Sequence, residues 1–342
     1  MNILFTSVGR MSYLVEYFKE ALGSDGKVHV ANSSASTPAF LAADETVVTP
    51  LIYDSEYIPF LLHYCKDNKI DAIIPLFDSD LSMLSKHSED FNKIGTQLVI
   101  SDFKIIELCN DKLKANEFLN EHGFTSPLTF TSVEQARQSI AQGNITYPLI
   151  VKPRWGTSSK FVFEADNIEE LLIFYKKVKR AIKNSSLKYL SADDPENDVI
   201  IQQKLKGREY GLDVINDLNG NYITTVAKKK YAMRSGETDC AITINSKPLK
   251  EIGEKLSLLL KHRANLDVDV FVDGNNFYVI DMNARFGGGY PFTHAAGVNL
   301  PKAIIEWLKG NTPDADILKE DFNCVAQKDI KIVKRDFDDW EF

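Results

Sequence analysis

The first hundred residues alternate short apolar runs with longer amphipathic stretches. The apolar runs at residues 2–6, 27–31, 71–76 and 97–100 have the length and composition of buried strands. The stretches between them, ending near residues 22, 68 and 91, place apolar side chains at helical spacing. This strand–helix alternation predicts a parallel α/β sheet.

The remaining chain mixes helical patterns with hairpin patterns. Helices are expected at residues 105–122, 132–142, 168–183 and 302–308, and strands at residues 147–153, 161–163, 199–204, 210–215 and 222–227. The last two strands flank Asn219-Gly220, a strong turn signal. Residues 110–112 form a polar break inside the first of these helices, and the polar residues 183–198 predict an exposed loop or hinge.

A hairpin near residue 280 carries the most informative chemistry. Residues 265–273 read as a strand, residues 273–276 as a turn, and residues 277–281 as the returning strand. Asp281, Asn283 and Arg285 alternate along that returning segment, so their side chains share one face. Mg²⁺ prefers oxygen ligands and completes its shell with substrate phosphates, so this set predicts a metal–phosphate site. The structural alternative is a buried strand whose polar residues cap a turn.

The first strand of this hairpin would add a third ligand. Pairing of the two strands brings either Asp267 or Asp269 beside Asp281. Both aspartates have the same parity along the strand, so the pattern alone cannot choose between them. Three oxygen ligands from paired strands would suit one or two divalent ions bound to nucleotide phosphates.

Three loops are candidate ligand contacts. Lys152 ends an apolar strand and precedes the small-residue loop 154–160, an arrangement typical of a phosphate cradle or of a flexible hairpin. Residues 7–10 and 78–80 follow two strands of the predicted parallel sheet, where such sheets bind ligands, although both are equally consistent with tight turns. No GxGxxG fingerprint follows the first strand.

Composition narrows the class of protein. A chain of 342 residues is expected to form two or three packed units. The net charge of −8 argues against a nucleic-acid or anionic-membrane binder, and the basic run at residues 228–230 does not reverse that. The four cysteines are widely separated and the six histidines form no metal motif, as expected of a reduced protein. No targeting segment or membrane span is apparent, so a cytoplasmic location is expected.

Several motifs occur together in one order along the chain. They are Asn110-Asp111-Lys112, the strand ending at Lys152-Pro153 with its loop, the segment 200–210, Arg234-Ser235-Gly236, Asp269, and the stretch 281–300. This ordered set resembles the ATP-grasp superfamily, in particular stand-alone proteins similar to the carbamoyl-phosphate synthase large subunit. The resemblance covers nearly the whole chain. It implies an α/β domain at 1–104, an ATP-grasp domain at 105–310 and a tail at 311–342, with a lid at about 115–190 and an antiparallel nucleotide and metal sheet at about 195–310.

The resemblance also implies roles for individual residues. It assigns Lys112 and Lys152 to the ATP phosphates, with Ser158 and Ser159 in the lid loop. Gln202, Gln203 and Leu205 match the strand that meets the adenine, and Glu209 matches the contact to the ribose. Asp269, Asp281 and Asn283 match the Mg²⁺ ligands, with Mn²⁺ as an alternative ion. Arg285 matches the arginine that stabilises the phosphate or acyl phosphate, and Arg234 is a further candidate contact. Two positions depart from the common pattern: Asp281 stands where glutamate is usual, and Ala284 where proline is usual.

The implied reaction is an ATP-dependent ligation. A carboxylate would be phosphorylated to an acyl phosphate and then captured by an amine or thiol, releasing ADP and phosphate. Alternatives are activation of bicarbonate or carbamate together with a partner subunit, and a nucleotide-binding protein without turnover. Relatives are often dimers, which makes a homodimer the candidate assembly. Candidate substrate contacts are Ser7, Gly9, Arg10, Asp78, Asp80, Pro291, Phe292, Thr293 and His294.

Overall fold

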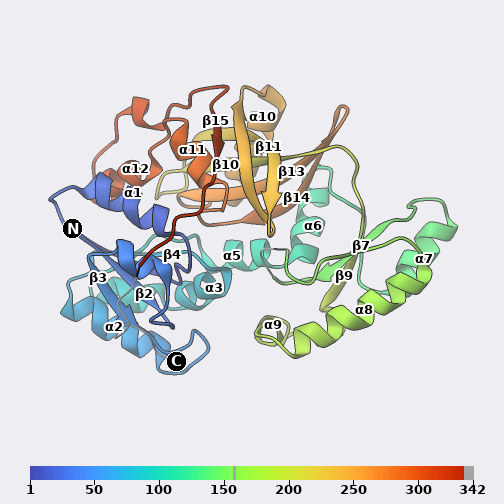
Figure 1. Ribbon diagram of the computed structural model, residues 1–342, viewed down its shortest axis with the longest axis horizontal. Helices are drawn as coiled ribbons and strands as arrows, with labels where there is room; N and C mark the ends of the chain where they lie inside the picture. The colour runs from blue at the N-terminus through green and yellow to red at the C-terminus, as the bar shows by residue number, and fades with distance from the viewer. Residues whose placement is uncertain (157–158, 335–342) are drawn as a thin grey trace.

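A parallel five-stranded sheet organises the amino-terminal part of the chain, as the strand–helix alternation predicts. The computed structural model describes residues 1–156 and 159–334 (Figure 1). The sheet has the order β3-β2-β1-β4-β5, with every neighbouring pair parallel. Its strands are β1 Asn2–Thr6, β2 Lys27–Asn32, β3 Glu45–Val48, β4 Ala72–Pro75 and β5 Gln97–Leu98. Its helices are α1 Ser12–Leu22, η1 Pro38–Ala42, α2 Tyr57–Asp67, α3 Asp78–Lys86 and α4 Ser88–Lys93.

Side-chain alternation along β1 explains how helices cover both faces of this sheet. Phe5 packs on one face with Phe18 of α1, and Leu4 packs on the other face with Leu61 of α2. The cluster around Phe5 also includes Ile304 from the carboxy-terminal part of the chain. The parallel sheet therefore shares a core with residues almost 300 positions away.

The single helix expected at residues 105–122 is wrong, because the structure contains two helices there. They are α5 Phe103–Asn110 and α6 Lys112–Glu121. Asp111 lies between them and caps α6 by accepting hydrogen bonds from the backbone amides of Leu113 and Lys114. Its carboxylate also pairs with Arg154, at 2.6 Å from Nε and 2.7 Å from Nη2. The polar break in the sequence is thus a helix cap fixed by a distant guanidinium group.

A four-stranded antiparallel sheet forms the next part, drawn in green at the right of Figure 1. Its order is β6-β9-β7-β8. The strands are β6 Thr129–Phe130, β7 Leu149–Pro153, β8 Phe163–Ala165 and β9 Val199–Gln203, and the helices are α7 Val133–Ala141, α8 Ile168–Lys183, α9 Leu187–Leu190 and η2 Pro195–Asn197. The segment 183–198, expected as a loop, therefore contains two short helical turns.

A six-stranded antiparallel sheet completes the fold, with the order β14-β13-β10-β11-β12-β15. The strands are β10 Arg208–Asn216, β11 Tyr222–Arg234, β12 Glu237–Ile244, β13 Asn265–Asp273, β14 Asn276–Asn283 and β15 Val325–Gln327. The helices are α10 Lys247–Leu260, α11 Tyr290–Ala295, α12 Leu300–Leu308 and η3 Ala315–Leu318. The sequence patterns described above did not predict β12 or α10.

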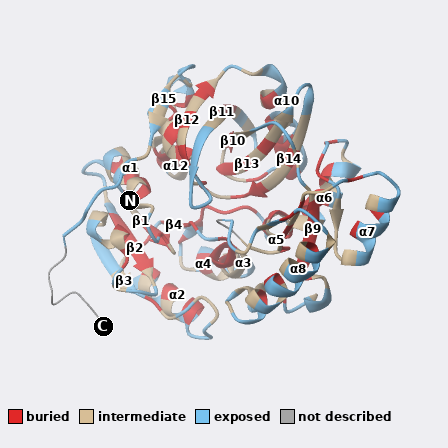
Figure 2. Cartoon of the chain, turned by 45° about the vertical axis from the view of Figure 1, so that its right-hand side comes forward, coloured by how far each residue is buried: buried red, intermediate tan, exposed pale blue. Residues whose placement is uncertain are grey.

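Burial follows this division into layers. Figure 2 shows buried residues concentrated along the strands of the parallel and six-stranded sheets, while the outward surfaces of α7 and α8 are largely exposed. Leu256 of α10 belongs to the cluster that packs on Leu212 of β10 and Leu266 of β13. Among the described residues, no helix is both long and apolar enough to cross a membrane.

Candidate functional site

The register of the β13–β14 hairpin decides which aspartate faces Asp281. Asp269 lies directly opposite Asp281, and Asp267 lies opposite Asn283. A register shift beside Asp269 interrupts the ladder, so strand parity alone could not have given this pairing. Two carboxylates and an amide thus come from adjacent positions of paired strands.

The largest cavity that opens onto this hairpin lies between the four-stranded and six-stranded sheets. Its volume is about 710 Å³, within the usual range for small-molecule sites. Ile150 of β7, Phe271 of β13 and Ile280 of β14 give it apolar walls. Nine of the predicted site residues line it: Lys112, Lys152, Ser159, Gln202, Gln203, Leu205, Glu209, Asp269 and Asp281. Ser158 lies outside the described residues.

Two lysines meet at one end of this cavity. Lys152, on β7, has its pKa lowered to about 8 by burial and then by the neighbouring charge of Lys112. Lys112 donates hydrogen bonds to the carbonyl oxygen of Gly156 at 2.9 Å and to Asp281 Oδ1 at 3.4 Å. An anion bound here would relieve the repulsion between the two ammonium groups.

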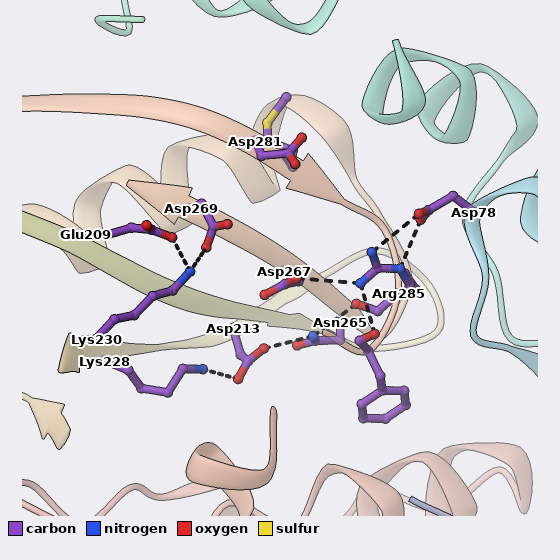
Figure 3. Close-up of polar contacts among 12 residues, drawn as sticks. Asp78, Glu209, Asp213, Lys228, Lys230, Asn265, Asp267, Asp269, Asp281 and Arg285 are labelled. Atoms are coloured by element: carbon purple, nitrogen blue, oxygen red, sulfur yellow. Dashed lines mark hydrogen bonds and ion pairs between the residues drawn. The ribbon is translucent and has the colours of Figure 1, made fainter. Parts of the chain in front are cut away.

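A third lysine bridges two of the acidic side chains. Lys230 Nζ lies 2.5 Å from Glu209 Oε1 and 2.5 Å from Asp269 Oδ1 (Figure 3). Burial alone would lower the pKa of Lys230, but Asp269 and Glu209 outweigh it and raise that pKa. Sequence reasoning missed this lysine. Its position on the same face of β11 as Lys228 was the available signal.

Arg285 lines a second cavity of about 220 Å³. Asp269 and Asp281 line both this cavity and the first one. Its guanidinium group donates to Asp78 at the start of α3, with Nε 2.9 Å from Oδ1 and Nη2 3.4 Å from Oδ2. Nη1 also lies 3.6 Å from Asp267 Oδ2. These contacts, visible in Figure 3, tie the six-stranded sheet to the parallel-sheet domain at the site.

The charges around Arg285 are strongly perturbed. Burial lowers the pKa of Arg285, but Asp78 and Asp267 more than compensate and raise it, so the guanidinium stays charged. Burial and the neighbouring Asp269 raise the pKa of Asp267 to about 7. The alternation 281, 283, 285 predicted from the sequence is confirmed, since all three side chains line this second cavity.

A buried polar network supports the backbone beside Arg285. Lys228 and Asp213 form an ion pair, and Lys228 Nζ lies 2.7 Å from Thr293 Oγ1. Asn265 Nδ2 donates to Asp213 Oδ1 at 3.0 Å and to the carbonyl oxygen of Arg285 at 3.2 Å. Thr293, a candidate substrate contact, therefore serves this network.

Other candidates lie away from the cavities. Asp80 is buried and accepts hydrogen bonds from Tyr57 at 2.7 Å and Ser7 at 2.9 Å. His294 stacks on Tyr17 with ring centroids 3.7 Å apart. In the described part of the chain, the following candidate residues do not line either of these two cavities: Arg10, Gly9, Pro291, Phe292 and Arg234. Of these, Arg234 is half-exposed and pairs with Asp239 at 3.2 Å.

The donor set fits a hard divalent cation. Asp269 and Asp281 face each other with Asn283 beside them, and hard cations such as Mg²⁺ take oxygen ligands. Among described residues, no group of three His, Cys, Asp or Glu side chains is arranged to hold a metal alone. An amide oxygen and ligand phosphates would complete such a shell, as is usual for Mg²⁺.

Comparisons with known protein families match two parts of the chain. Residues 3–99 match the family described as PylC-like, N-terminal domain, and residues 195–330 match ATP-grasp in the biosynthetic pathway with Ter operon. The carbamoyl phosphate synthase large chain of Helicobacter pylori is 26% identical over 288 residues, which cover 80% of this chain and 25% of that one. The chain thus spans about a quarter of the length of such curated relatives.

Solved structures share the fold at lower identity. A biotin carboxylase from Campylobacter jejuni has a TM-score of 0.72 at 18% identity, covering 93% of this chain and 73% of that one. An N5-carboxyaminoimidazole synthetase from Staphylococcus aureus, complexed with ADP, has a TM-score of 0.69 at 19% identity, with coverages of 95% and 79%. An L-amino acid ligase from Bacillus licheniformis has a TM-score of 0.63 at 21% identity, with coverages of 90% and 74%. The predicted fold class, with a parallel domain and antiparallel sheets, is confirmed.

Proposed function

Because this chain belongs to the ATP-grasp superfamily, we propose that it is an ATP-dependent ligase that joins a small carboxylate to an amine or a thiol. The observation that carries the proposal is the meeting of opposite charges at one point. The lysine pair at residues 112 and 152 faces the opposed Asp269 and Asp281, with Arg285 in the adjoining cavity. Such an arrangement binds phosphates and stabilises charge during phosphoryl transfer.

ATP would occupy the 710 Å³ cavity. Its flat base suits the apolar walls between the two sheets, next to Gln202 and Gln203 of β9 and to Leu205 just after that strand. Glu209 would accept hydrogen bonds from the ribose hydroxyls, for which it must share its carboxylate with Lys230. Lys112 and Lys152 would contact the phosphates.

Asp269, Asp281 and Asn283 would hold Mg²⁺, or Mn²⁺ in its place. When bound, the ion neutralises phosphate charge and helps to orient the transferring group. Asp281 is one methylene shorter than glutamate, so it reaches less far into the cavity. Its contact with Lys112 at 3.4 Å supports a position close to the phosphates.

The chemical steps follow from the charges on the chain. An oxygen of the substrate carboxylate attacks the γ-phosphorus of ATP, and ADP leaves, which gives an acyl phosphate. The amine nitrogen then attacks the acyl carbon, loses a proton, and phosphate leaves. Arg285 would bind the carboxylate and then the acyl phosphate, and the loop at residues 159–160, which lines the same cavity, would help to exclude water.

Other features of the proposal stay predictions. The domain boundaries near residues 104 and 310, a homodimer and a cytoplasmic location belong to it. The similarity to carbamoyl phosphate synthase favours one alternative reaction, the activation of bicarbonate with a partner subunit.

ADP release tests the proposal. Mg-ATP would be supplied with pools of carboxylates, amines, thiols and bicarbonate, and the Asn283→Ala variant compared with Asn275→Ala in the exposed turn of the same hairpin. Turnover with a carboxylate and an amine or thiol, lost in Asn283→Ala and kept in Asn275→Ala, is expected. Turnover with bicarbonate alone would instead favour the alternative. Silence with every pool despite ATP binding would refute both reactions.

A further inference from the structure

A third cavity, of about 150 Å³, adjoins the other two and has no role in the function described so far. Phe77, which directly precedes α3, forms one part of the cavity wall. Leu187 and Leu190 of α9, in the segment 183–198, form another part. The cavity shares Asn283 with the 220 Å³ cavity lined by Arg285, here called the Arg285 cavity. It shares Lys112 with the 710 Å³ cavity proposed for ATP, here called the nucleotide cavity. It is therefore an apolar space that opens onto the groups proposed for phosphoryl transfer.

The helix α9 is held over this cavity by a contact with the parallel-sheet domain. The Tyr189 ring stacks on Tyr53, with centroids 4.4 Å apart and planes 24° apart. Tyr53 in turn donates a hydrogen bond to Ser79 Oγ at 2.8 Å, and Ser79 lines the cavity. In Figure 1, α9 lies beside the left-hand end of α8, on the side toward α3.

A partly buried ion pair holds the same segment just after α9. Arg154 Nη1 lies 2.7 Å from Asp194, and the same guanidinium group holds Asp111 between α5 and α6. The segment that carries α9 is thus held at two points, Tyr189 and Asp194. The polar segment nevertheless directs two leucines three residues apart, which lie on the same face of the helical turn, into the cavity.

Loose packing is the alternative explanation for this space. Leu187 and Leu190 are both partly exposed, whereas core leucines of this protein such as Leu171 are fully buried. The leucines therefore face an accessible space that also contacts Asp78, Lys112 and Asn283. A void left by chance packing would have no reason to open onto these polar groups.

We propose that this cavity binds the apolar group of the carboxylate substrate, and thereby selects an acid with a ring or a branched chain. The proposal rests on the ligase function. A cavity of about 150 Å³ whose lining surface is mainly apolar holds a group about the size of benzene, and the polar lining residues, among them Asp78 and Lys112, are left for the carboxylate end of the substrate. With that group between Phe77 and α9, the carboxylate lies near Asn283, where the cavity meets the Arg285 cavity. Glu237 and Asp267 then face the space left for the amine.

Direct binding to the full-length protein in the presence of MgADP tests the assignment without requiring turnover. The probes are 3-phenylpropionate and glutarate, which both carry a carboxylate but differ in the remaining group. The wild-type protein is expected to bind 3-phenylpropionate at least about tenfold more tightly, since even one methylene in an apolar pocket changes discrimination by about tenfold or more.

Substitutions in α9 locate the preference. Leu190→Lys is expected to abolish it, because the change places a charge in the cavity. Leu172→Lys on α8, which replaces a leucine that is 43% exposed, is the matched control and should keep it. Leu187→Ala serves as a second variant if Leu190→Lys does not fold. Tyr189→Ala, which loosens the contact with Tyr53, should weaken binding of 3-phenylpropionate while leaving ADP affinity unchanged.

The outcomes separate this proposal from the ligase proposal. Absence of a preference in the wild-type protein, whether both acids bind or neither does, overturns the cavity assignment, as does a preference that survives in the cavity variant. A preference that is present and lost as expected, in a protein that releases no ADP with any acid, would support the site and refute the ligase function.

Discussion

The lowered pKa of Lys152 allows the proposed phosphate contact to be measured as proton uptake when nucleotide binds. In the structure, burial and Lys112 lower this pKa from 10.5 to about 8. Phosphate oxygens beside the ammonium group would favour its charged form and raise the pKa again. Above pH 8, nucleotide binding should therefore be accompanied by uptake of a proton by Lys152.

The magnitude follows from the two pKa values. A return from about 8 to 10.5 corresponds to about 3 kcal/mol of additional interaction with the charged lysine. Affinity for ATP should be nearly independent of this group below pH 7. It should then weaken by up to about tenfold per pH unit between pH 8 and pH 10.5. At pH 9 the uptake should approach about 0.9 proton for each ATP bound.

Folding stability should respond to the same group with the opposite pH dependence. Because the pKa of Lys152 in the folded protein is lowered, burial of the charged lysine destabilises the ligand-free protein below pH 8. That destabilisation should fade as the pH rises from 8 toward 10.5, the value expected for the unfolded chain.

Isothermal titration calorimetry in buffers with different ionisation enthalpies measures the proton uptake directly. Titrations at pH 7 and pH 9 should differ in the wild-type protein. Lys152→Arg, which keeps the charge without titrating in this range, should show the same small uptake at both values. Equal uptake at the two pH values in the wild-type protein, or an unchanged increase in Lys152→Arg, would refute the reasoning.

Two further substitutions test the contacts that support the site, with the stability of the folded protein as the measured quantity. A Cβ atom at Gly287 would lie 2.1 Å from Asp267 Cγ, so Gly287→Ala should destabilise the protein by about 1–3 kcal/mol in urea unfolding, whereas Gly289→Ala, whose nearest contact is 3.7 Å away, should be tolerated. Lys228→Met should cost about 3–5 kcal/mol in the same assay, because it leaves the Asp213 carboxylate buried without its cation. A midpoint within error of the wild type for either of the two destabilising variants would contradict the role given to that contact.

Local patterns were sufficient to predict those elements whose signals lie close together in the sequence. The helix α8 begins and ends where its apolar spacing predicts, and the Asn167 side chain caps it by accepting a hydrogen bond from the Glu170 amide. The β13–β14 hairpin also follows from alternation and the turn at residues 273–276. In both cases the determining residues lie within one helix or one turn.

Features that depend on distant residues could not be predicted in this way. The break at Asp111 is stabilised by Arg154, which is 43 positions away along the chain. The choice between Asp267 and Asp269 depends on a one-residue register shift beside Asp269, which the alternation of the strands does not reveal. Lys230 belongs to the site because it contacts two carboxylates, Glu209 on β10 and Asp269 on β13. In the sequence it is only one member of a charged run at residues 228–230.

The same distant contacts indicate how the site is held ready for its ligands. Every carboxylate proposed to hold the metal contacts a lysine in this structure, Asp269 through Lys230 and Asp281 through Lys112. These ammonium groups keep the negative charges from repelling one another. Binding therefore requires an exchange of partners, in which Lys112 leaves Asp281 for a phosphate while Asp281 becomes available as a ligand. Because the two halves of the exchange assist each other, nucleotide and cation should bind this chain more tightly together than separately.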